Sequence, residues 1–410
     1  MRADSKLDPW ISTGLGALVL CLFNSGCGDN GSGDGASEDE VGTLDTGATG
    51  DSETSGSGSG STGDTSADTD TDTSDAESSA DESETETTGT PDPGFGPWCD
   101  PPPACDDPLP PPGAELDWEH FDTNLIVLAG DPNHRIRDSF YVPGEIQWLM
   151  GKFAYGIIDK DLKDERVDVY VQRDCAGPWE LVAESWTTEE GAHATVEGVE
   201  DSGGWVYAAL PDDLTLGLGR HRVHMVVRGD QTSTSGFIEV VEPGTPLFLS
   251  DIDGTLTTFE TEEFVDLLAG VVPDAHPFAA ADLSTLQAKG YHAMYLTARP
   301  EWLVERSRDF IATRGFPPGI IHTTLSFEGA LGGDAEIYKT EEFQRLADKG
   351  LVPTYVFGNT DSDGAAYENA GIEPLDNRIF ILFDDPHGGR RIESYGDINA
   401  EFEALEDLCD

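Results

Sequence analysis

Two aspartates separated by one residue, Asp251 and Asp253, are the strongest chemical signal in the sequence. They begin the run Asp-Ile-Asp-Gly-Thr, which directly follows an apolar stretch at 246–250. Carboxylates this close together at the end of a buried strand repel each other unless a cation neutralises them. Their spacing therefore predicts a site for a hard divalent metal ion.

Three further polar clusters follow along the chain. Thr297-Ala-Arg299 comes after a second apolar stretch and offers a hydroxyl and a cation for phosphate oxygens. Lys339 precedes a predicted helix, and Asn359 and Asp363 lie in the run Gly-Asn-Thr-Asp-Ser-Asp after another apolar stretch. All four clusters thus follow or flank elements of regular structure.

Strand and helix patterns alternate after Thr245, which indicates a mainly parallel sheet with helices on both faces, a three-layer Rossmann-like α/β domain. In such a sheet, functional groups gather at the carboxyl ends of the strands. The predicted strands are 246–250, 292–296, 320–324, 354–357 and 378–382, and the predicted helices are 261–269, 283–289, 300–314 and 341–348.

The order of these motifs resembles the haloacid dehalogenase (HAD) superfamily. The pattern is DxDxT after a strand, Thr after a second strand, Lys before a helix and GNxxxD after a later strand. DxDGT alone is only moderately specific, but all four in order and in context are not a generic feature of α/β domains. The resemblance implies a phosphatase that requires Mg2+.

A narrower resemblance covers roughly the last 200 residues. The stretches at 295–300 and 357–367 look like the lipin-type phosphatidic acid phosphatase domain. The stretches at 219–230 and 244–255 are similar to the C-terminal region, called LNS2, of the Nir-type membrane-associated phosphatidylinositol transfer proteins. This likeness implies that the preceding β-rich module is an integral companion of the phosphatase-like domain.

These two relatives differ in chemistry. Lipins are Mg2+-dependent phosphatases, whereas the Nir-type domain has lost the nucleophilic aspartate and is regarded as a phosphatidic acid sensor. Here both Asp251 and Asp253 are present, which favours catalysis. The alternatives are a non-catalytic phosphatidic acid-binding module and a phosphatase of soluble phosphomonoesters.

The HAD resemblance also implies a role for each site residue. Asp251 would attack phosphorus to form an aspartyl-phosphate, and Asp253 would protonate the leaving oxygen and then deprotonate water. Thr297 and Lys339 would bind the phosphoryl oxygens. Arg299 would either bind a lipid headgroup or cap the helix that follows it.

For the metal, the same resemblance implies that Mg2+ binds to the Asp251 carboxylate, the Asp253 backbone carbonyl, and Asp363 or Asn359. Asp361 is expected to be exposed and structural, because Asp363 fits the spacing of the motif better.

The intervals between the motifs leave no room for a large cap domain. The segment from Lys339 to Gly358 is short, and the one from Asp253 to Thr297 must already hold helices and a strand. An uncapped site would admit a bulky or membrane-embedded phosphomonoester such as phosphatidic acid.

Residues 118–243 carry short apolar or alternating runs broken by turn residues, a pattern typical of an antiparallel β-sandwich. The runs are 124–128, 145–154, 167–172, 179–182, 205–209, 221–227 and 236–241. His221 and His224 are expected to be strand residues, because no third metal ligand lies at a suitable spacing.

The N-terminal quarter of the chain has a different character. Residues 1–26 resemble a signal peptide with an apolar core, and the small residues before Cys27 resemble a bacterial lipobox, which implies an exported lipoprotein acylated on Cys27. Residues 27–117 are acidic and rich in Ser, Thr and Gly, then rich in Pro, so they are predicted to be a disordered tether. The domain with the four motifs then occupies 244–410.

Apart from Cys21 and Cys27, four cysteines remain in a compartment that would be oxidising: Cys99, Cys105, Cys175 and Cys409. They permit three pairings, among which Cys99 with Cys105 is the local one. Alternatively, Cys175 and Cys409 stay free and buried.

The net charge of −57 excludes a nucleic-acid partner. Taken together, the sequence predicts a phosphatase anchored by lipid in the cell envelope, on the periplasmic or cell-surface side of a membrane.

Overall fold

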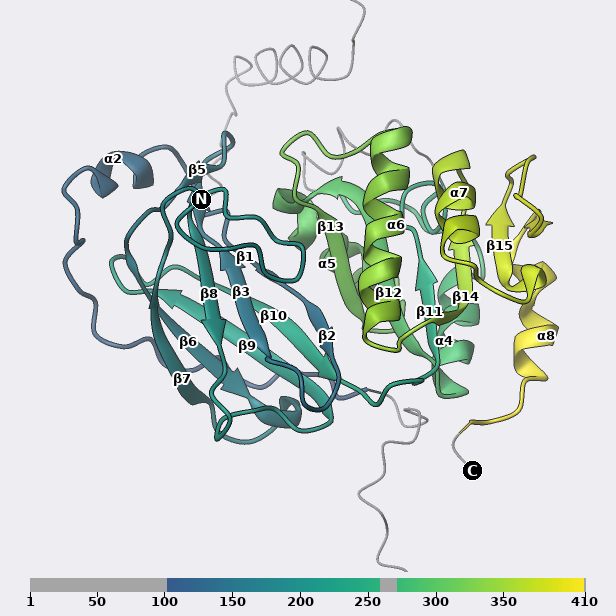
Figure 1. Ribbon diagram of the computed structural model, residues 1–410, viewed down its shortest axis with the longest axis horizontal. Helices are drawn as coiled ribbons and strands as arrows, with labels where there is room; N and C mark the ends of the chain where they lie inside the picture. The colour runs from purple at the N-terminus through teal and green to yellow at the C-terminus, as the bar shows by residue number, and fades with distance from the viewer. Residues whose placement is uncertain (1–101, 259–270, 409–410) are drawn as a thin grey trace, which may run out of the picture. The chain divides into compact units, whose positions relative to one another are not determined.

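The computed structural model describes residues 102–258 and 271–408, in which a β-rich domain precedes an α/β domain (Figure 1). All of these residues belong to one compact unit, Pro93–Asp410. The predicted signal peptide, the acylation of Cys27, the acidic part of the tether and the helix at 261–269 lie outside the described residues, as do Cys99 and Cys409.

The β-rich domain contains two facing sheets, as the alternating pattern predicts. Its core lies between them, and β6 shows why: Val167, Val169 and Val171 are fully buried in this core at every second position. One sheet has the order β1 (Arg135–Arg137), β3 (Trp148–Lys152), β8 (Trp205–Ala209). The other has the order β2 (Ser139–Tyr141), β10 (Ser233–Val240), β9 (Gly219–Val227), β6 (Arg166–Gln172), β7 (Glu180–Trp186).

All pairs in these two sheets are antiparallel except β2 with β10. A small hairpin of β4 (Ala154–Tyr155) and β5 (Lys160–Asp161) completes the domain. His221 and His224 are strand residues of β9, as expected, and they hydrogen-bond to Gly217 and Ser235.

Two parts of the β-rich domain differ from the sequence prediction. The run at 124–128 forms a short helix, α2 (Thr123–Val127), in which Ile126 and Val127 pack against the sandwich core while Leu125 and Leu128 are exposed. The sequence pattern does not predict β1, β2, β4 and β5 as separate strands. The charged side chains Arg135 and Arg137 of β1 are buried by ion pairs, which hides the apolar pattern of a buried strand.

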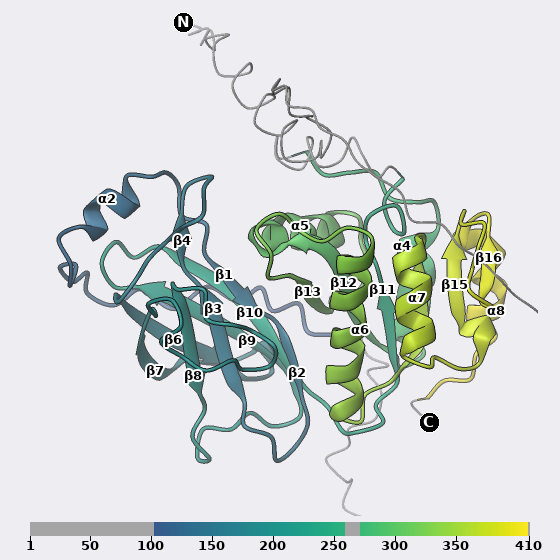
Figure 2. The ribbon, with the colours of Figure 1, turned by 45° about the horizontal axis from the view of Figure 1, so that its top comes forward.

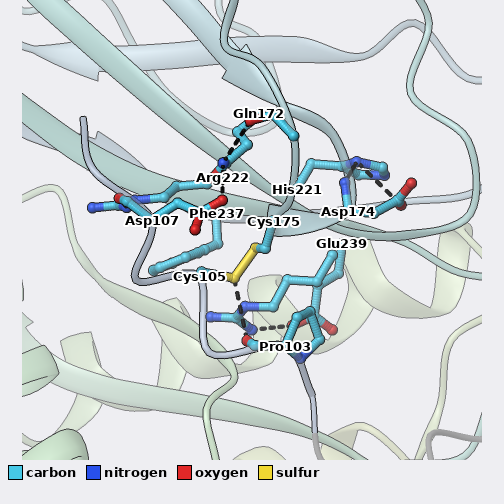
Figure 3. Close-up of a disulfide and its surroundings, with 12 residues drawn as sticks. Pro103, Cys105, Asp107, Gln172, Asp174, Cys175, His221, Arg222, Phe237 and Glu239 are labelled. Carbon is cyan, nitrogen blue, oxygen red and sulfur yellow. Dashed lines mark hydrogen bonds and ion pairs between the residues drawn. A yellow bond between two sulfur atoms is a disulfide. The ribbon is translucent and has the colours of Figure 1, made fainter. Parts of the chain in front are cut away.

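The boundary predicted at residue 117 is wrong, because the segment from 102 onward is attached to the sandwich. Cys105 and Cys175 form a disulfide (Figure 3). Beside it, the side chains of Gln172 and Arg222 hydrogen-bond to Asp107. Of the predicted pairings, the structure therefore excludes the local Cys99–Cys105 bond, and Cys175 is not free.

The α/β domain contains a six-stranded, fully parallel sheet, which confirms the predicted parallel architecture. Its order is β13 (Ile320–Thr324), β12 (His292–Pro300), β11 (Leu247–Ser250), β14 (Pro353–Gly358), β15 (Arg378–Ile381), β16 (Arg390–Ile392). Because β12 and β14 flank β11 on opposite sides, the chain order reverses beside β11. Such a switch point is where open α/β sheets place their sites.

Helices cover both faces of this sheet (Figure 2). Phe248 of β11 packs in a cluster with α4 (Ala279–Ala288), α5 (Val304–Thr313) and α8 (Asn399–Glu403). Its neighbours Leu247 and Leu249 point the other way, into a cluster with α6 (Gly333–Asp348) and α7 (Asp361–Asn369). Short 3-10 turns occur at Arg173–Cys175, Glu301–Leu303, Leu375–Asn377 and Tyr395–Asp397.

Helix α6 begins earlier than predicted, so Lys339 lies within it instead of before it. Gly332 precedes the helix, and Asp334 and Glu336 occupy its first turn, where acidic side chains are favourable. The predicted helix after Pro300 starts as the 3-10 turn and becomes α5, and Gly315 follows it in the left-handed region. Over the described ranges, no helix is both long and apolar enough to cross a membrane.

The Cys105–Cys175 disulfide joins residues 70 positions apart, so it restricts the unfolded chain strongly. We expect the double substitution Cys105→Ser with Cys175→Ser to lower the free energy of unfolding by about 2 to 5 kcal/mol. Urea unfolding of the full chain measures this. Reductant should destabilise the wild type and leave the double variant unchanged, and equal stability of the two oxidised proteins would contradict the prediction.

Candidate functional site

The site lies at the carboxyl edge of the parallel sheet, where β11, β12 and β14 end side by side. Strand β11 is buried along its whole length, and Asp251 follows it directly. The backbone N–H of Asp251 donates to the carbonyl of Phe357 in β14 at 3.0 Å, which extends the strand pairing to the aspartate. The first carboxylate is thus fixed by the sheet itself.

Lys339 crosses from α6 to this edge and bridges two carboxylates. Its Nζ lies 2.8 Å from Asp251 Oδ1 and 2.5 Å from Asp363 Oδ1. All three residues are buried, with exposed fractions of 3% for Lys339, 4% for Asp251 and 0% for Asp363. Two carboxylates therefore share one ammonium group out of contact with water.

The electrostatics of this triad leave an excess of negative charge. Burial raises the pKa of Asp251 to about 7 against the opposing charge of Lys339, and Asp363 and Asp253 add to the rise. Burial by itself would lower the pKa of Lys339, but Asp251 and Asp363 outweigh it, so the pKa of Lys339 lies above its ordinary value. Lys339 is therefore charged at neutral pH.

Asp363 is held by the start of helix α7. Thr360 caps this helix, and Asp363 Oδ2 accepts hydrogen bonds from the backbone N–H of Asn359, the backbone N–H of Thr360 and the Thr360 hydroxyl. The other oxygen, Oδ1, faces Lys339. Asp361 is exposed, as expected, and accepts from His387.

Asp253 belongs to a second group on the β12 side of the site. Arg299 contacts both of its carboxylate oxygens, with distances of 2.6 Å from Nη2 to Oδ1 and 3.0 Å from Nε to Oδ2. The Thr297 hydroxyl donates to Oδ2 at 3.0 Å. Arg299 also reaches Ser307 on α5 at 3.0 Å. The guanidinium thus holds Asp253, and binding a substrate through Arg299 would require it to release this carboxylate.

Thr255 joins Asp251 to the Asn359 segment that follows β14, a role that the sequence interpretation did not assign. Its hydroxyl lies 3.1 Å from Asp251 Oδ2 and 2.8 Å from Asn359 Oδ1. Tyr395 donates to the Thr255 carbonyl at 3.0 Å. The sequence could have indicated Thr255, because it is the threonine of the DxDxT pattern. No local pattern marks Ser307 or Tyr395 as residues of the site.

The donors at this edge suit a hard divalent cation. Asp251, Asp363 and Asn359 present oxygens, and two of these groups are carboxylates that share the single ammonium group of Lys339. Across residues 102–258 and 271–408, no three His, Cys, Asp or Glu side chains already surround one point. The Asp253 carboxylate faces Arg299, so its backbone carbonyl is the donor that remains for a metal.

Two family models match the chain. The model described as PITM 1-3, beta-sandwich domain, matches residues 132–240, and the model described as PITM 1-3, LNS2 domain, matches residues 248–383. A β-sandwich domain therefore precedes an LNS2 domain, which confirms the LNS2 resemblance and the pairing of the two modules. These matches do not bear on the broader HAD resemblance.

The chain is also similar to parts of longer proteins. Protein retinal degeneration B of Drosophila melanogaster is 31% identical over 268 residues, which are 65% of this chain and 19% of that protein. Membrane-associated phosphatidylinositol transfer protein 1 of Homo sapiens is 28% identical over 264 residues, 64% of this chain and 19% of that protein. The chain thus spans about a fifth of the length of these curated relatives.

Lys339→Met should destabilise the protein, because it leaves Asp251 and Asp363 buried without their cation. We expect the free energy of unfolding to fall by about 3 to 5 kcal/mol, as for other buried pairs that lose one partner. The matched control is Lys289→Met, which removes the more exposed pair with Asp407 and should cost about 0 to 1 kcal/mol. Urea unfolding tests both, and equal costs would mean that the carboxylates do not depend on Lys339.

Proposed function

From this pairing of a β-sandwich with an LNS2 domain, we propose that the chain hydrolyses phosphomonoesters through an aspartyl-phosphate on Asp251, as HAD-type phosphatases do. The observation that carries the proposal is that the two aspartates of the site are held by different partners. Asp251 is paired with Lys339, and Asp253 is held apart by Arg299 and Thr297. Two carboxylates held in separate places can act as nucleophile and, once Arg299 releases Asp253, as acid-base group.

In the first step, an Asp251 carboxylate oxygen forms a bond to phosphorus while the bond from phosphorus to the ester oxygen breaks. Asp253 gives a proton to that leaving oxygen. In the second step, Asp253 takes a proton from water, the water oxygen attacks phosphorus, and the Asp251 carboxylate leaves. Lys339 and Thr297 bind the phosphoryl oxygens and offset their charge.

Mg2+ is the cofactor that we propose for this site. The Asp251 carboxylate, the Asp253 backbone carbonyl, and Asp363 or Asn359 would hold it, and it would supply positive charge to the phosphoryl group. The excess of negative charge around Lys339 supports this assignment.

A lipid phosphomonoester such as phosphatidic acid is the substrate that we propose. The names of the curated relatives refer to phosphatidylinositol transfer and to association with membranes. We also propose that the chain is exported and carries a lipid anchor on Cys27. The anchor would hold the chain beside a membrane in the cell envelope and so close to a lipid substrate.

A second candidate function is binding of phosphatidic acid without turnover. It is favoured by one observation on this structure: both oxygens of Asp251 already have partners, Lys339 on one and Thr255 on the other. In this reading the same group of residues recognises the phosphate headgroup but does not transfer it. Hydrolysis of soluble phosphomonoesters is the third candidate, with the same chemistry and another substrate.

Asp251→Asn should lower Mg2+-dependent phosphate release from phosphatidic acid by about 1,000-fold or more, because the amide oxygen is a poor nucleophile. Asp361→Asn is the matched control, since Asp361 is exposed and lies outside the triad, and it should stay within about twofold of the wild type. Phosphate release by the full chain measures both. Equal rates for the wild type and Asp251→Asn would sink the proposed mechanism.

Removal of Mg2+ separates the three candidates. The proposed enzyme should stop releasing phosphate from phosphatidic acid vesicles when a chelator is added, and should recover when Mg2+ is restored. A panel of soluble phosphomonoesters runs beside the vesicles. Release from soluble esters alone would reject the lipid substrate, and headgroup-dependent vesicle binding without turnover or a need for Mg2+ would favour the binding module.

A further inference from the structure

Strand β1 of the sandwich places two arginines against the LNS2 domain. Arg135 and Arg137 are two residues apart and so lie on the same face of β1, while Ile136 between them belongs to the sandwich core. Both arginines are buried, with exposed fractions of 3% and 8%. Buried guanidinium groups are costly unless they are paired, so their partners define what this face of β1 does.

Arg135 fixes β1 beside the end of β12. Its Nη2 lies 2.7 Å from Glu301 Oε1 and 2.6 Å from Asp159 Oδ2. Glu301 is two residues beyond Arg299, which holds Asp253. The position of β1 is thus set relative to the strand that carries half of the site.

Arg137 contacts the helix that carries Lys339. Its Nη2 lies 2.5 Å from Glu342 Oε1, and its Nη1 donates to the Thr323 carbonyl of β13 at 2.9 Å. Glu342 is one helical turn beyond Lys339 on α6. Arg137 therefore fastens α6 to the end of β13 at a point one helical turn from Lys339.

Glu342 stays ionised in this position. Burial would raise its pKa, but Arg137 and His322 hold the pKa of Glu342 well below its usual range. His322 Nδ1 lies 2.7 Å from Glu342 Oε2, and Arg345 Nη2 lies 3.1 Å from Oε1. Such a buried charged network adds little stability compared with apolar packing, but it fixes one arrangement of the groups that it joins.

We propose that Arg137 is a positioning residue for Lys339: through Glu342, the sandwich sets where α6 places the ammonium group between Asp251 and Asp363. The catalytic part of this inference rests on the proposed function, whereas the placement of Lys339 does not. The alternative is that Arg137 only helps to hold the two domains together.

Arg220 provides a matched control for that alternative. It is also buried in the sandwich, and it pairs with Glu239, which in turn contacts His292 of the LNS2 domain. His292 is the first residue of β12, at the opposite end of the strand from Thr297. Arg220→Met therefore breaks a buried charge pair of the same interface, but far along the sheet from Lys339.

The first readout is acylation of Lys339 by acetic anhydride, followed by mass spectrometry of the full chain. Lys152, which is buried within the sandwich, serves as the internal reference. We expect Arg137→Met to raise the labelling rate of Lys339 by about 10-fold or more, because a released α6 exposes the amine. Arg220→Met should leave this rate unchanged. Unchanged labelling in Arg137→Met, or an equal rise in both variants, would overturn the inference.

The second readout is catalysis. Arg137→Met should lower kcat on phosphatidic acid vesicles by about 10-fold to 100-fold with little change in KM, as expected for a misplaced catalytic group. Arg137→Lys keeps the cation and should recover part of kcat and of the protection of Lys339; it also replaces Arg137→Met if that variant does not fold. A kcat equal to that of the wild type in a folded, active Arg137→Met would overturn the inference. If the wild type proves inactive while Arg137→Met still raises the labelling of Lys339, the proposed function is rejected and the placement of Lys339 by Arg137 stands.

Discussion

The site depends on one ammonium group that must neutralise two buried carboxylates. Lys339 does this for Asp251 and Asp363, and the three side chains come from a helix, a strand end and the start of a second helix. None of them is stable in its place without the others, since each isolated charge would face the cost of burial. The strand order around β11, the cap of α7 and the approach of α6 are therefore parts of a single electrostatic arrangement.

Much of the α/β domain was predictable from sequence because its signals are local. Strand β11 is an apolar run buried on both faces, and Asp251 and Asn359 stand directly after the strands that end at the site. Thr297 and Arg299 lie in the last residues of β12, which extends beyond the predicted end at 296. The resemblance to the HAD motifs assigned Lys339 to the site. Its place inside α6 could not be predicted, because the start of this helix depends on glycine and acidic residues that precede the apolar pattern.

The rest was not predictable because it arises between residues far apart in the chain. Nothing in the sequence around Arg299 indicates that its guanidinium holds Asp253 and reaches Ser307, and nothing around Cys105 selects Cys175. The charged strand β1 lacks the apolar run of a strand buried on both faces, since its arginines are neutralised by Glu301 and Glu342 of the other domain. Long-range ion pairs and disulfides carry no sequence period, so only the folded structure brings them together.

The burial of Glu301 and Glu342 under β1 also bears on how such chains arise in evolution. An LNS2 domain separated from its sandwich would expose Glu301 and Glu342 at a surface shaped to receive guanidinium groups, and the sandwich would keep Arg137 without its carboxylate and Arg135 with Asp159 alone. Gene rearrangements that cut between the two domains would thus yield two impaired products, whereas rearrangements outside the pair would not. The sandwich and the LNS2 domain should accordingly be inherited and shuffled as one piece.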